Sequence, residues 1–198
     1  MQNPESKKFS LVLFASGNGT NAVNIIDQAK NLNTYDVDRV FSNYKNAPIV
    51  KKAEDKNLAV TTFTKDEFYN TNSIKDELEK IDPDLIVLAG FMWIFPKFIL
   101  DKFPGKVINI HPALLPKYGG KGMYGDKVHQ AVLAKDEPKS GITIHYVNEH
   151  YDEGKVIAQY DVPIDKNENL SSLKDKIQKL EHRYYPLVIH QLLKQKNG

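Results

Sequence analysis

Apolar and polar residues alternate along this chain in segments that predict strands and helices in turn. Short apolar runs bounded by turn residues predict strands at 9–14, 37–41, 59–63, 84–90 and 107–111. Between these runs, apolar residues at helical spacing predict helices at 23–29, 47–57, 73–80 and 98–103. Strands that alternate with helices in this way are typical of an α/β domain whose sheet is largely parallel.

The pattern changes after Pro112. Two further apolar runs, at 142–147 and 156–162, are joined by a polar loop, and we expect them to form an antiparallel addition at the sheet edge. The predicted fold is therefore α/β and Rossmann-like, with a mostly parallel central sheet, flanking helices and an antiparallel addition in the C-terminal half. No linker or repeat interrupts the chain, so we predict a single domain over 1–198, in which 1–8 form a flexible N-terminus.

The last segment of the chain, from Ser171, predicts a long helix. Apolar residues recur there at steps of three and four, which places one side of the helix against the core. The predicted stripe consists of Leu173, Ile177, Leu180, Tyr184 and Leu187. Because proline lacks a backbone N–H, we expect Pro186 to kink or break this helix.

Charge narrows the classes of function. The chain carries 27 basic and 25 acidic residues, a net charge of +2, and the two signs are interspersed. This balance does not indicate a basic surface of the kind that binds nucleic acid. Arg39 and Arg183 are the only arginines, so an anion site would depend on backbone amides or on lysine.

Cysteine is absent, which excludes disulfides, thiolate catalysis and zinc sites built on cysteine, and which fits a cytoplasmic protein. No apolar run approaches the roughly 18 residues that a membrane span requires, so we expect no contact with a membrane. The six histidines show no spacing typical of a metal site. We therefore predict that no metal is bound.

A glycine-rich turn follows the first predicted strand. Residues 17–22, Gly-Asn-Gly-Thr-Asn-Ala, match the GxGxxG/A pattern that exposes backbone amides at a helix N-terminus. A dinucleotide site would need an acidic residue after the second strand, where the sequence reads Ser42-Asn43. A P-loop is excluded, because no Gly-Lys-Ser/Thr follows. The turn fits either a monophosphate site, to which Thr20 and Asn21 add side-chain donors, or a tight turn without a ligand.

A polar pair ends the fifth predicted strand. Asn109 and His111 flank Ile110, so their side chains point to the same face, where the carboxyl ends of α/β strands form ligand crevices. An asparagine amide can donate to a developing oxyanion, and a histidine can relay a proton or share the oxyanion charge. No GxSxG elbow or cysteine supplies a nucleophile, so the pair fits direct attack of a substrate amine on a carbonyl. The alternative is a pair of satisfied polar groups that cap the strand.

A loop acid could tune this histidine. A carboxylate near His111 would raise its pKa and hold it cationic near neutrality. Asp152, in the polar loop 148–154, is the candidate. The alternative interpretation is that Asp152 is an exposed acidic residue of the loop without a role at the site.

Several of these motifs together resemble a known family. They follow one another in the order found in the folate-dependent formyltransferases, from about residue 9 to the C-terminal helix. The motifs are 88–92 (Leu-Ala-Gly-Phe-Met), 109–116 (Asn-Ile-His-Pro-Ala-Leu-Leu-Pro), His145 and Asp152-x-Gly154. The turn at 16–21 is similar to that of members that act on a glycinamide ribonucleotide. The resemblance implies transfer of the formyl group of a co-substrate, 10-formyltetrahydrofolate, to the amine of 5′-phosphoribosylglycinamide in purine synthesis.

The resemblance also implies roles for individual residues. In the catalytic group, Asn109 binds the formyl oxygen, His111 stabilises the tetrahedral intermediate and Asp152 tunes that histidine. The residues implied for the ribonucleotide are Gly19, Thr20, Asn21 and Glu181. The residues implied for the folate are Met92, Trp93, Ile94, Phe95, Asn109, Asn148, His150 and Asp152. The implied partners are small molecules only, and the chain is expected to act as a monomer or homodimer.

Some features depart from the family or stay open. Trp93 stands where bacterial relatives usually carry arginine, which is tolerable if the contacts there come from the backbone. The glycine-rich segment 119–125 is expected to form a mobile loop over the substrate or a plain connector. His129 and His145 are expected to line the pocket or to be structural histidines.

Other functions are possible. A methionyl-tRNA formyltransferase is expected to carry a C-terminal RNA-binding domain, and a formyltetrahydrofolate deformylase an N-terminal regulatory domain; chain length and the glycine turn favour neither. An NAD-dependent oxidoreductase would use 17–22 but would leave Asn109, His111 and Asp152 unexplained. A binding module without activity would bind a nucleotide and show no turnover.

Overall fold

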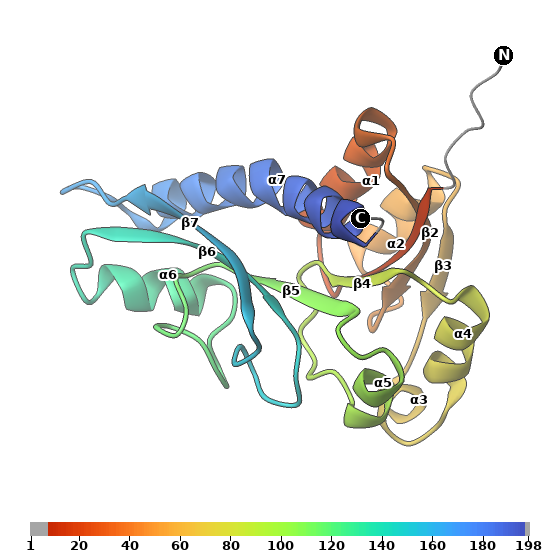
Figure 1. Cartoon of the computed structure of the whole chain (residues 1–198). Helices are drawn as coiled ribbons and strands as arrows, with labels where there is room; N and C mark the ends of the chain where they lie inside the picture. The colour runs from red at the N-terminus through yellow and green to blue at the C-terminus, as the bar shows by residue number, and fades with distance from the viewer. Residues whose placement is uncertain (1–7, 197–198) are drawn as a thin grey trace, which may run out of the picture.

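One seven-stranded sheet organises the chain (Figure 1). The computed structural model describes residues 8–196, so the expected flexible N-terminus lies, apart from Lys8, outside the described residues. The strands lie in the order β3-β2-β1-β4-β5-β6-β7. Along the chain the elements are β1 (Phe9–Phe14), α1 (Thr20–Leu32), β2 (Tyr35–Ser42), α2 (Pro48–Glu54), β3 (Ala59–Thr62), α3 (Lys65–Tyr69), α4 (Ser73–Ile81), β4 (Leu85–Leu88), α5 (Lys97–Lys102), β5 (Val107–His111), α6 (Asp126–Leu133), β6 (Lys139–Tyr146), β7 (Val156–Pro163) and α7 (Leu170–Gln195).

The sheet is parallel from β3 to β5, and β6 pairs antiparallel with both β5 and β7. This arrangement confirms the predicted Rossmann-like α/β fold with its antiparallel addition in the C-terminal half. The chain leaves β1 towards β2 on one side and returns to β4 on the other side, so the strand order reverses there. Ligands of open parallel sheets bind outside the carboxyl ends of the strands at such a point.

Two hydrophobic cores cover the two faces of the sheet. Because successive residues of a strand point to opposite faces, Leu11 and Leu13 of β1 join the core beneath α1, α2 and α7. Val12 and Phe14 join the other core, which α3, α4 and α5 cover (Figure 1). The ring of Phe14 stacks on Phe41 of β2, with centroids 4.7 Å apart. The strand is thus fixed on both faces where it enters the glycine-rich turn.

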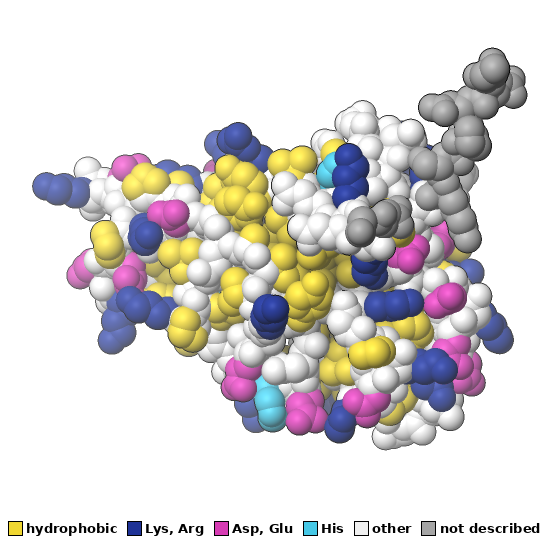
Figure 2. All heavy atoms as spheres, in the orientation of Figure 1, with side chains coloured by type: hydrophobic (Ala, Val, Ile, Leu, Met, Phe, Trp, Pro, Cys, Tyr) yellow, Lys and Arg dark blue, Asp and Glu magenta, His cyan; other side chains and the backbone are white. Residues whose placement is uncertain are grey.

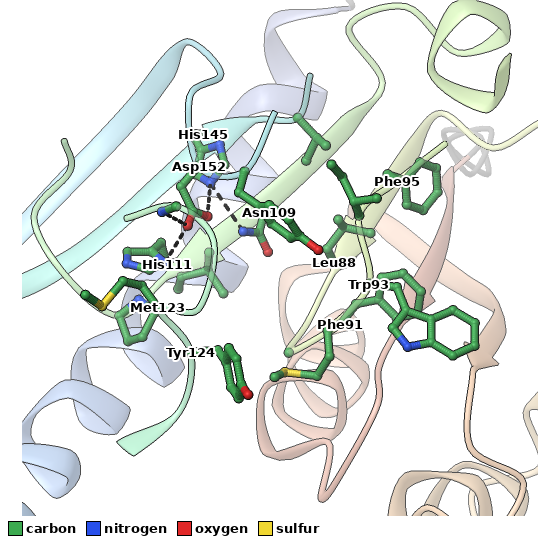
Figure 3. Close-up of a pocket in the computed structure, with 18 of the residues that line it drawn as sticks. Leu88, Phe91, Trp93, Phe95, Asn109, His111, Met123, Tyr124, His145 and Asp152 are labelled. Atoms are coloured by element: carbon green, nitrogen blue, oxygen red, sulfur yellow. Dashed lines mark hydrogen bonds and ion pairs between the residues drawn. The ribbon is translucent and has the colours of Figure 1, made fainter. Parts of the chain in front are cut away.

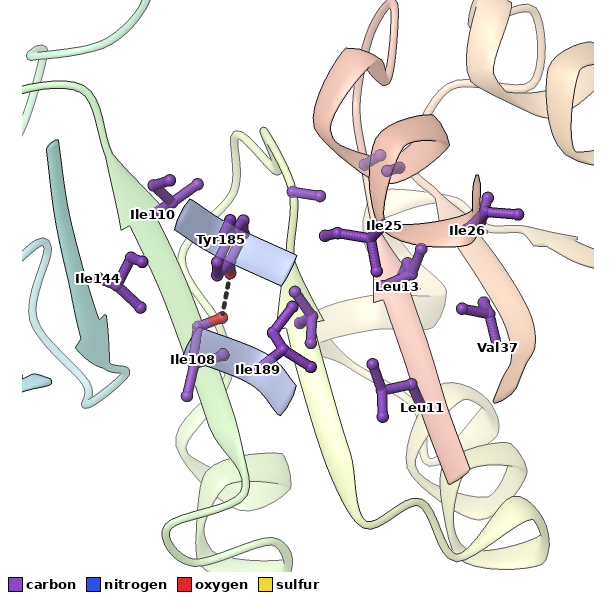
Figure 4. Packing of buried hydrophobic residues seen from close by; sticks show 14 of the residues in the cluster. Leu11, Leu13, Ile25, Ile26, Val37, Ile108, Ile110, Ile144, Tyr185 and Ile189 are labelled. Atoms are coloured by element: carbon purple, nitrogen blue, oxygen red, sulfur yellow. Dashed lines mark hydrogen bonds between the residues drawn. The ribbon is translucent and has the colours of Figure 1, made fainter. Parts of the chain in front are cut away.

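The C-terminal helix α7 fixes the strands that carry the polar pair. Its Tyr185 hydroxyl lies 3.0 Å from the carbonyl oxygen of Leu88 at the end of β4. The same hydroxyl lies 3.4 Å from the carbonyl oxygen of Ile108 on β5 (Figure 4). The helix continues through Pro186, so the expected break does not occur. Leu187 is 40% exposed, which contradicts its place in the predicted stripe. The buried positions in this part of the helix are Tyr185, Pro186, Val188, Ile189 and Leu193.

Two helices were not predicted. α3 is five residues long and begins with a capping box in which Thr64 and Glu67 bond each other's backbone. α6 follows the glycine-rich segment and buries Val128, His129 and Val132, too short a pattern to identify a helix by periodicity.

The face of the molecule seen in Figure 2 mixes lysine and arginine with acidic side chains and has no field of one sign. Among the described helices, none is both long and apolar enough to cross a membrane.

Candidate active site

A cavity of about 620 Å³ opens at the carboxyl ends of β4 and β5 (Figure 3). It gathers most of the site residues predicted from the sequence: Asn21, Met92, Trp93, Ile94, Phe95, Asn109, His111, Asn148, His150, Asp152 and Glu181. Gly19 and Thr20 do not line it and lie just before Asn21. His129, His145 and residues 120–125 also line the cavity, so the glycine-rich segment is part of its wall.

We call one side of this cavity the histidine wall; it consists of Asn109, His111, His145 and Asp152. His145 orients the amide of Asn109. Nδ1 of His145 lies 2.8 Å from the carbonyl oxygen of Tyr146, which can only accept, so Nδ1 carries a proton. In the neutral ring, Nε2 then accepts a hydrogen bond from Nδ2 of Asn109 at 3.2 Å. One N–H of the amide is used in this way, and the other is available to a ligand.

His111 is buried and has an acceptor near each ring nitrogen. Its Nε2 donates to the carbonyl oxygen of Tyr118 at 2.7 Å, and its Nδ1 lies 3.5 Å from Oδ2 of Asp152. Burial lowers the pKa of His111 below its usual value, and this outweighs the opposite effects of Asp152 and of the Tyr118 carbonyl. The expectation that Asp152 holds His111 cationic near neutrality is therefore wrong, because the imidazolium loses its hydration in the protein. The ring is neutral at rest, with acceptors in place for a transient imidazolium.

Asp152 lies between the two histidines (Figure 3). Its Oδ2 accepts a hydrogen bond from the backbone N–H of Gly120 at 2.9 Å, and its Oδ1 lies 3.7 Å from Nε2 of His145. The side chain is only 11% exposed. One carboxylate therefore contacts both histidines of the wall and the glycine-rich segment.

Two glycines allow the close backbone packing around Asp152. A Cβ at Gly154 would lie 1.6 Å from the carbonyl oxygen of Tyr146, a contact that the backbone cannot allow. A Cβ at Gly119 would lie 2.5 Å from Cδ2 of Leu115 and 3.2 Å from Cβ of Asp152. The glycine of the Asp152-x-Gly154 motif is thus a steric requirement of the turn that presents Asp152.

The loop after His111 is anchored on β6. The hydroxyl of Thr143 accepts from the backbone N–H of Leu115 at 3.0 Å and donates to the carbonyl oxygen of Ala113 at 2.7 Å. Because Thr143 is fully buried, these bonds form away from water and hold the loop firmly. The loop then places the carbonyl of Tyr118 against His111.

The segment after β4 is held mainly through its backbone. The N–H of Met92 donates to Oγ of Ser16 at 2.9 Å, and the hydroxyl of Tyr69 donates to the carbonyl oxygen of Ile94 at 2.9 Å. The ring of Trp93 packs into the aromatic cluster of the second core, 6.0 Å from the ring of Tyr69. Trp93 therefore extends this cluster at the edge of the cavity.

A second group of polar residues in the cavity lining, which we call the glutamate wall, consists of Asn21, His129 and Glu181. Nδ2 of Asn21 donates to Oε2 of Glu181 at 2.8 Å. Burial raises the pKa of Glu181, and the bond from Asn21 offsets only part of this effect. Oδ1 of Asn21 and Nδ1 of His129 are buried and have no partner among the described residues. Buried polar atoms are costly to leave unpaired, so this wall is suited to a polar ligand.

Within residues 8–196, no group of three or more histidine, aspartate or glutamate side chains is placed to hold a metal ion.

Residues 9–189 match a family model described as formyl transferase. The chain belongs to the formyl transferase family. It is 35% identical to the phosphoribosylglycinamide formyltransferase of Bacillus subtilis over 94% of this chain and 95% of that protein. It is also 35% identical to the chloroplastic enzyme of that name from Arabidopsis thaliana, of which it spans 65% of the length, slightly less than two thirds. The crystal structure of phosphoribosylglycinamide formyltransferase from Bacillus halodurans is similar, with a TM-score of 0.84, 32% identity and coverage of 93% and 95%.

This membership in the formyl transferases confirms the resemblance seen in the motifs. It does not by itself assign roles to residues, which rest on the geometry of the cavity. The structure decides the open expectation for two histidines, because His129 and His145 both line the cavity and His145 bonds Asn109. The supporting roles of Ser16, Tyr118 and Thr143 were not predicted from the sequence. Only Thr143 left a signal, as a polar residue within an apolar run.

Proposed function

We propose that this chain transfers the formyl group of 10-formyltetrahydrofolate to the amine of 5′-phosphoribosylglycinamide, a step of de novo purine synthesis. The relatives named phosphoribosylglycinamide formyltransferase support this proposal. The observation that carries it is that two different sets of polar groups line one cavity. The histidine wall offers donors and a proton carrier to a carbonyl, and the glutamate wall offers a carboxylate to an amine.

Each substrate has a distinct part of the cavity in this proposal. The formyl-folate lies along 92–95 and the loop 148–152, which places its formyl group at the histidine wall. The ribonucleotide places its phosphate at the turn 19–21 and its amine near Glu181. The hydrogen bond between Asn21 and Glu181 connects the proposed phosphate position with the proposed amine position.

The reaction begins with attack of the glycinamide nitrogen on the formyl carbon. A C–N bond forms, and the carbonyl electron pair moves to the formyl oxygen. The free N–H of Asn109 donates to this oxyanion, and His111 shares its charge as an imidazolium next to Asp152. The developing negative charge favours protonation of His111, which burial disfavours in the resting enzyme.

Collapse of the tetrahedral intermediate completes the transfer. The bond between the formyl carbon and N10 of the folate breaks, and its electron pair stays on N10. The amine nitrogen loses one proton, and N10 gains one. His111 and Asp152, 3.5 Å apart, are placed to carry this proton.

The other candidate functions have less support in the structure. The residues after β2, Ser42 and Asn43, are buried and carry no carboxylate, so the ribose of a dinucleotide lacks its usual acceptor there. A deformylase would use the histidine wall but has no use for a second, polar wall. A cytoplasmic location fits a chain without cysteine, although one plant relative is named chloroplastic.

The proposal is tested by mixing the protein with both substrates and following the folate absorbance. We expect loss of formyl-folate only when 5′-phosphoribosylglycinamide is present, with formation of its N-formyl product. Loss of formyl-folate without the acceptor would indicate a deformylase. The proposal would be contradicted if no formyl-folate were lost under either condition while a related enzyme, assayed in parallel as a control, was active.

A further inference from the structure

Helix α1 begins with uncapped backbone amides. Its N-cap, Gly19, has a φ of +65° and no side chain to accept from them, and the first turn carries no acidic residue. Such a helix start attracts an anion through its free N–H groups and its dipole. Asn21 in this turn is 8% exposed and its Nδ2 donates to Oε2 of Glu181 at 2.8 Å, so the donors that the turn offers to an anion are its backbone N–H groups.

A lysine from another element contacts this turn. Nζ of Lys52, on α2, donates to the carbonyl oxygen of Asn18 at 2.8 Å. α2 is itself seated on the turn, since the N–H of Ile49 donates to the carbonyl oxygen of Gly17 at 3.2 Å. A Cβ at Gly19 would lie 2.4 Å from Cδ1 of Ile49, so glycine is required for this close approach. The backbone of α2 therefore fixes where Lys52 can reach.

The charge of Lys52 is not compensated by the protein. Its neighbour Lys51 pairs with Asp55 at 3.4 Å, and Lys56 pairs with Asp27 at 2.5 Å. In the part of the chain that the structure describes, Lys52 has no carboxylate partner. Its ammonium has three N–H bonds, and the Asn18 carbonyl uses one. A positive charge with free donors is therefore held beside the uncapped helix.

Neither arginine can serve the turn. Arg39 is paired with Glu77 on the other core, and the guanidinium of Arg183 lies over the ring of Tyr184 at 5.2 Å. We propose that Lys52 is a positioning residue for the phosphate of the acceptor, in addition to the backbone of 19–21. Its ammonium donates to the phosphate with the N–H groups that the Asn18 carbonyl leaves free. This inference rests on the proposed function, because it deepens the assignment of the turn.

The consequence is a selectivity for a phosphorylated acceptor. A dianion at the turn gains a charge-assisted hydrogen bond from Lys52, whereas the same riboside without phosphate gains nothing. Lys52 lies outside the cavity lining and does not contact the reacting atoms, so its effect should fall on acceptor binding.

The test compares Lys52→Met with Lys51→Met, a matched control because both lysines are exposed and adjacent on α2. We expect Lys52→Met to raise the KM for 5′-phosphoribosylglycinamide about tenfold or more, with little change in kcat or in the KM for formyl-folate. Lys51→Met should stay near the wild type, and Lys52→Arg should recover most of the affinity. Equal melting temperatures of the variants would show that the fold is intact.

The dephosphorylated acceptor separates phosphate binding from support of the turn. With the riboside as substrate, Lys52→Met and the wild type should have the same kcat/KM. An equal loss of kcat/KM with both acceptors would mean that Lys52 only holds the turn. An unchanged KM for the ribonucleotide would mean that Lys52 does not contribute to phosphate binding. Either result overturns the inference.

A binding measurement keeps the inference testable if the proposed reaction fails. Titration calorimetry with ribose 5-phosphate requires no turnover. We expect Lys52→Met to weaken this binding about tenfold and Lys51→Met to leave it unchanged. Binding that is lost equally in both variants, or in neither, would contradict the role of Lys52 whether or not formyl transfer occurs.

Discussion

The two walls of the cavity differ in how their polar groups are satisfied. In the histidine wall, hydrogen bonds and close polar contacts connect Asn109, His111, His145 and Asp152 with one another and with nearby backbone. In the glutamate wall, Oδ1 of Asn21 and Nδ1 of His129 have no partner among the described residues. The first wall is thus prepared before a ligand arrives, and the second is completed by one.

This difference fits the chemistry that each wall faces. A transition state is stabilised best by donors that need not move when charge develops. A substrate is bound by groups that lose little when they exchange water for the ligand. We therefore expect substitutions in the histidine wall to act mainly on kcat and substitutions in the glutamate wall mainly on KM.

The largest effect is expected for His111→Ala. The variant loses both the shared oxyanion charge and the proton carrier, so kcat should fall by about 10³-fold, within the range typical of acid–base groups. The KM for the ribonucleotide should change less than about threefold. Steady-state kinetics with both substrates measure these values. His190→Ala is a suitable control, because His190 bonds Thr34 and does not line the cavity. A turnover near that of the wild type would remove His111 from the mechanism.

The second effect concerns Asp152→Asn, which keeps the shape of the side chain and removes its charge. The charge of Asp152 raises the pKa of His111 against the effect of burial, so its removal should lower that pKa further. The resting enzyme needs neutral His111, and kcat/KM falls as the pH drops through this pKa. The acidic limb of the profile should therefore move to lower pH, and kcat should fall about 10- to 100-fold. An acidic limb at the wild-type position would show that the two groups are not coupled.

More residues of the histidine wall could be predicted from the sequence than contacts that hold them in place. Asn109 and His111 stand out because two polar residues at spacing two interrupt a buried strand. His145 stands in the same kind of run, yet its bond to Asn109 depends on the pairing of β5 with β6, in which these residues are register partners. Pairing between distant strands leaves no local trace in a sequence.

The direction of the His111 pKa shift could not be predicted for a related reason. A nearby carboxylate is visible in the motif Asp152-x-Gly154, whereas the depth of burial is set by the loop after Pro112 and by β6. The fold could be predicted more fully from the sequence, because every strand is marked by an apolar run. The misplaced Leu187 shows the limit of counting steps of three and four, since the buried face of α7 passes instead through Tyr185 and Val188.

In the glutamate wall, Glu181→Gln should affect binding and stability in opposite directions. Loss of the carboxylate should raise the KM for the ribonucleotide about tenfold, because its amine loses a charged acceptor. Burial raises the pKa of Glu181 in the folded state, so its contribution to stability is full below about pH 4.5 and is lost as the pH rises. The variant lacks this titration. Its melting temperature should therefore rise relative to the wild type between about pH 5 and 8. A variant that is less stable across this range would show that the Asn21–Glu181 bond outweighs the cost of burying the charge.

The smallest effect is expected outside both walls, for Tyr69→Phe. The Tyr69 hydroxyl holds the carbonyl of Ile94 in the segment proposed to contact the folate, and burial raises its pKa to about 12, so it is a neutral donor. A neutral hydrogen bond contributes about 0.5–1.5 kcal/mol, which corresponds to a rise of about two- to tenfold in the KM for formyl-folate. The ribonucleotide KM and kcat should stay unchanged. In the double variant with His111→Ala, the two effects should add, because Tyr69 positions the folate and His111 acts on the formyl group. Strong non-additivity would mean that the segment after β4 also determines the geometry of the histidine wall.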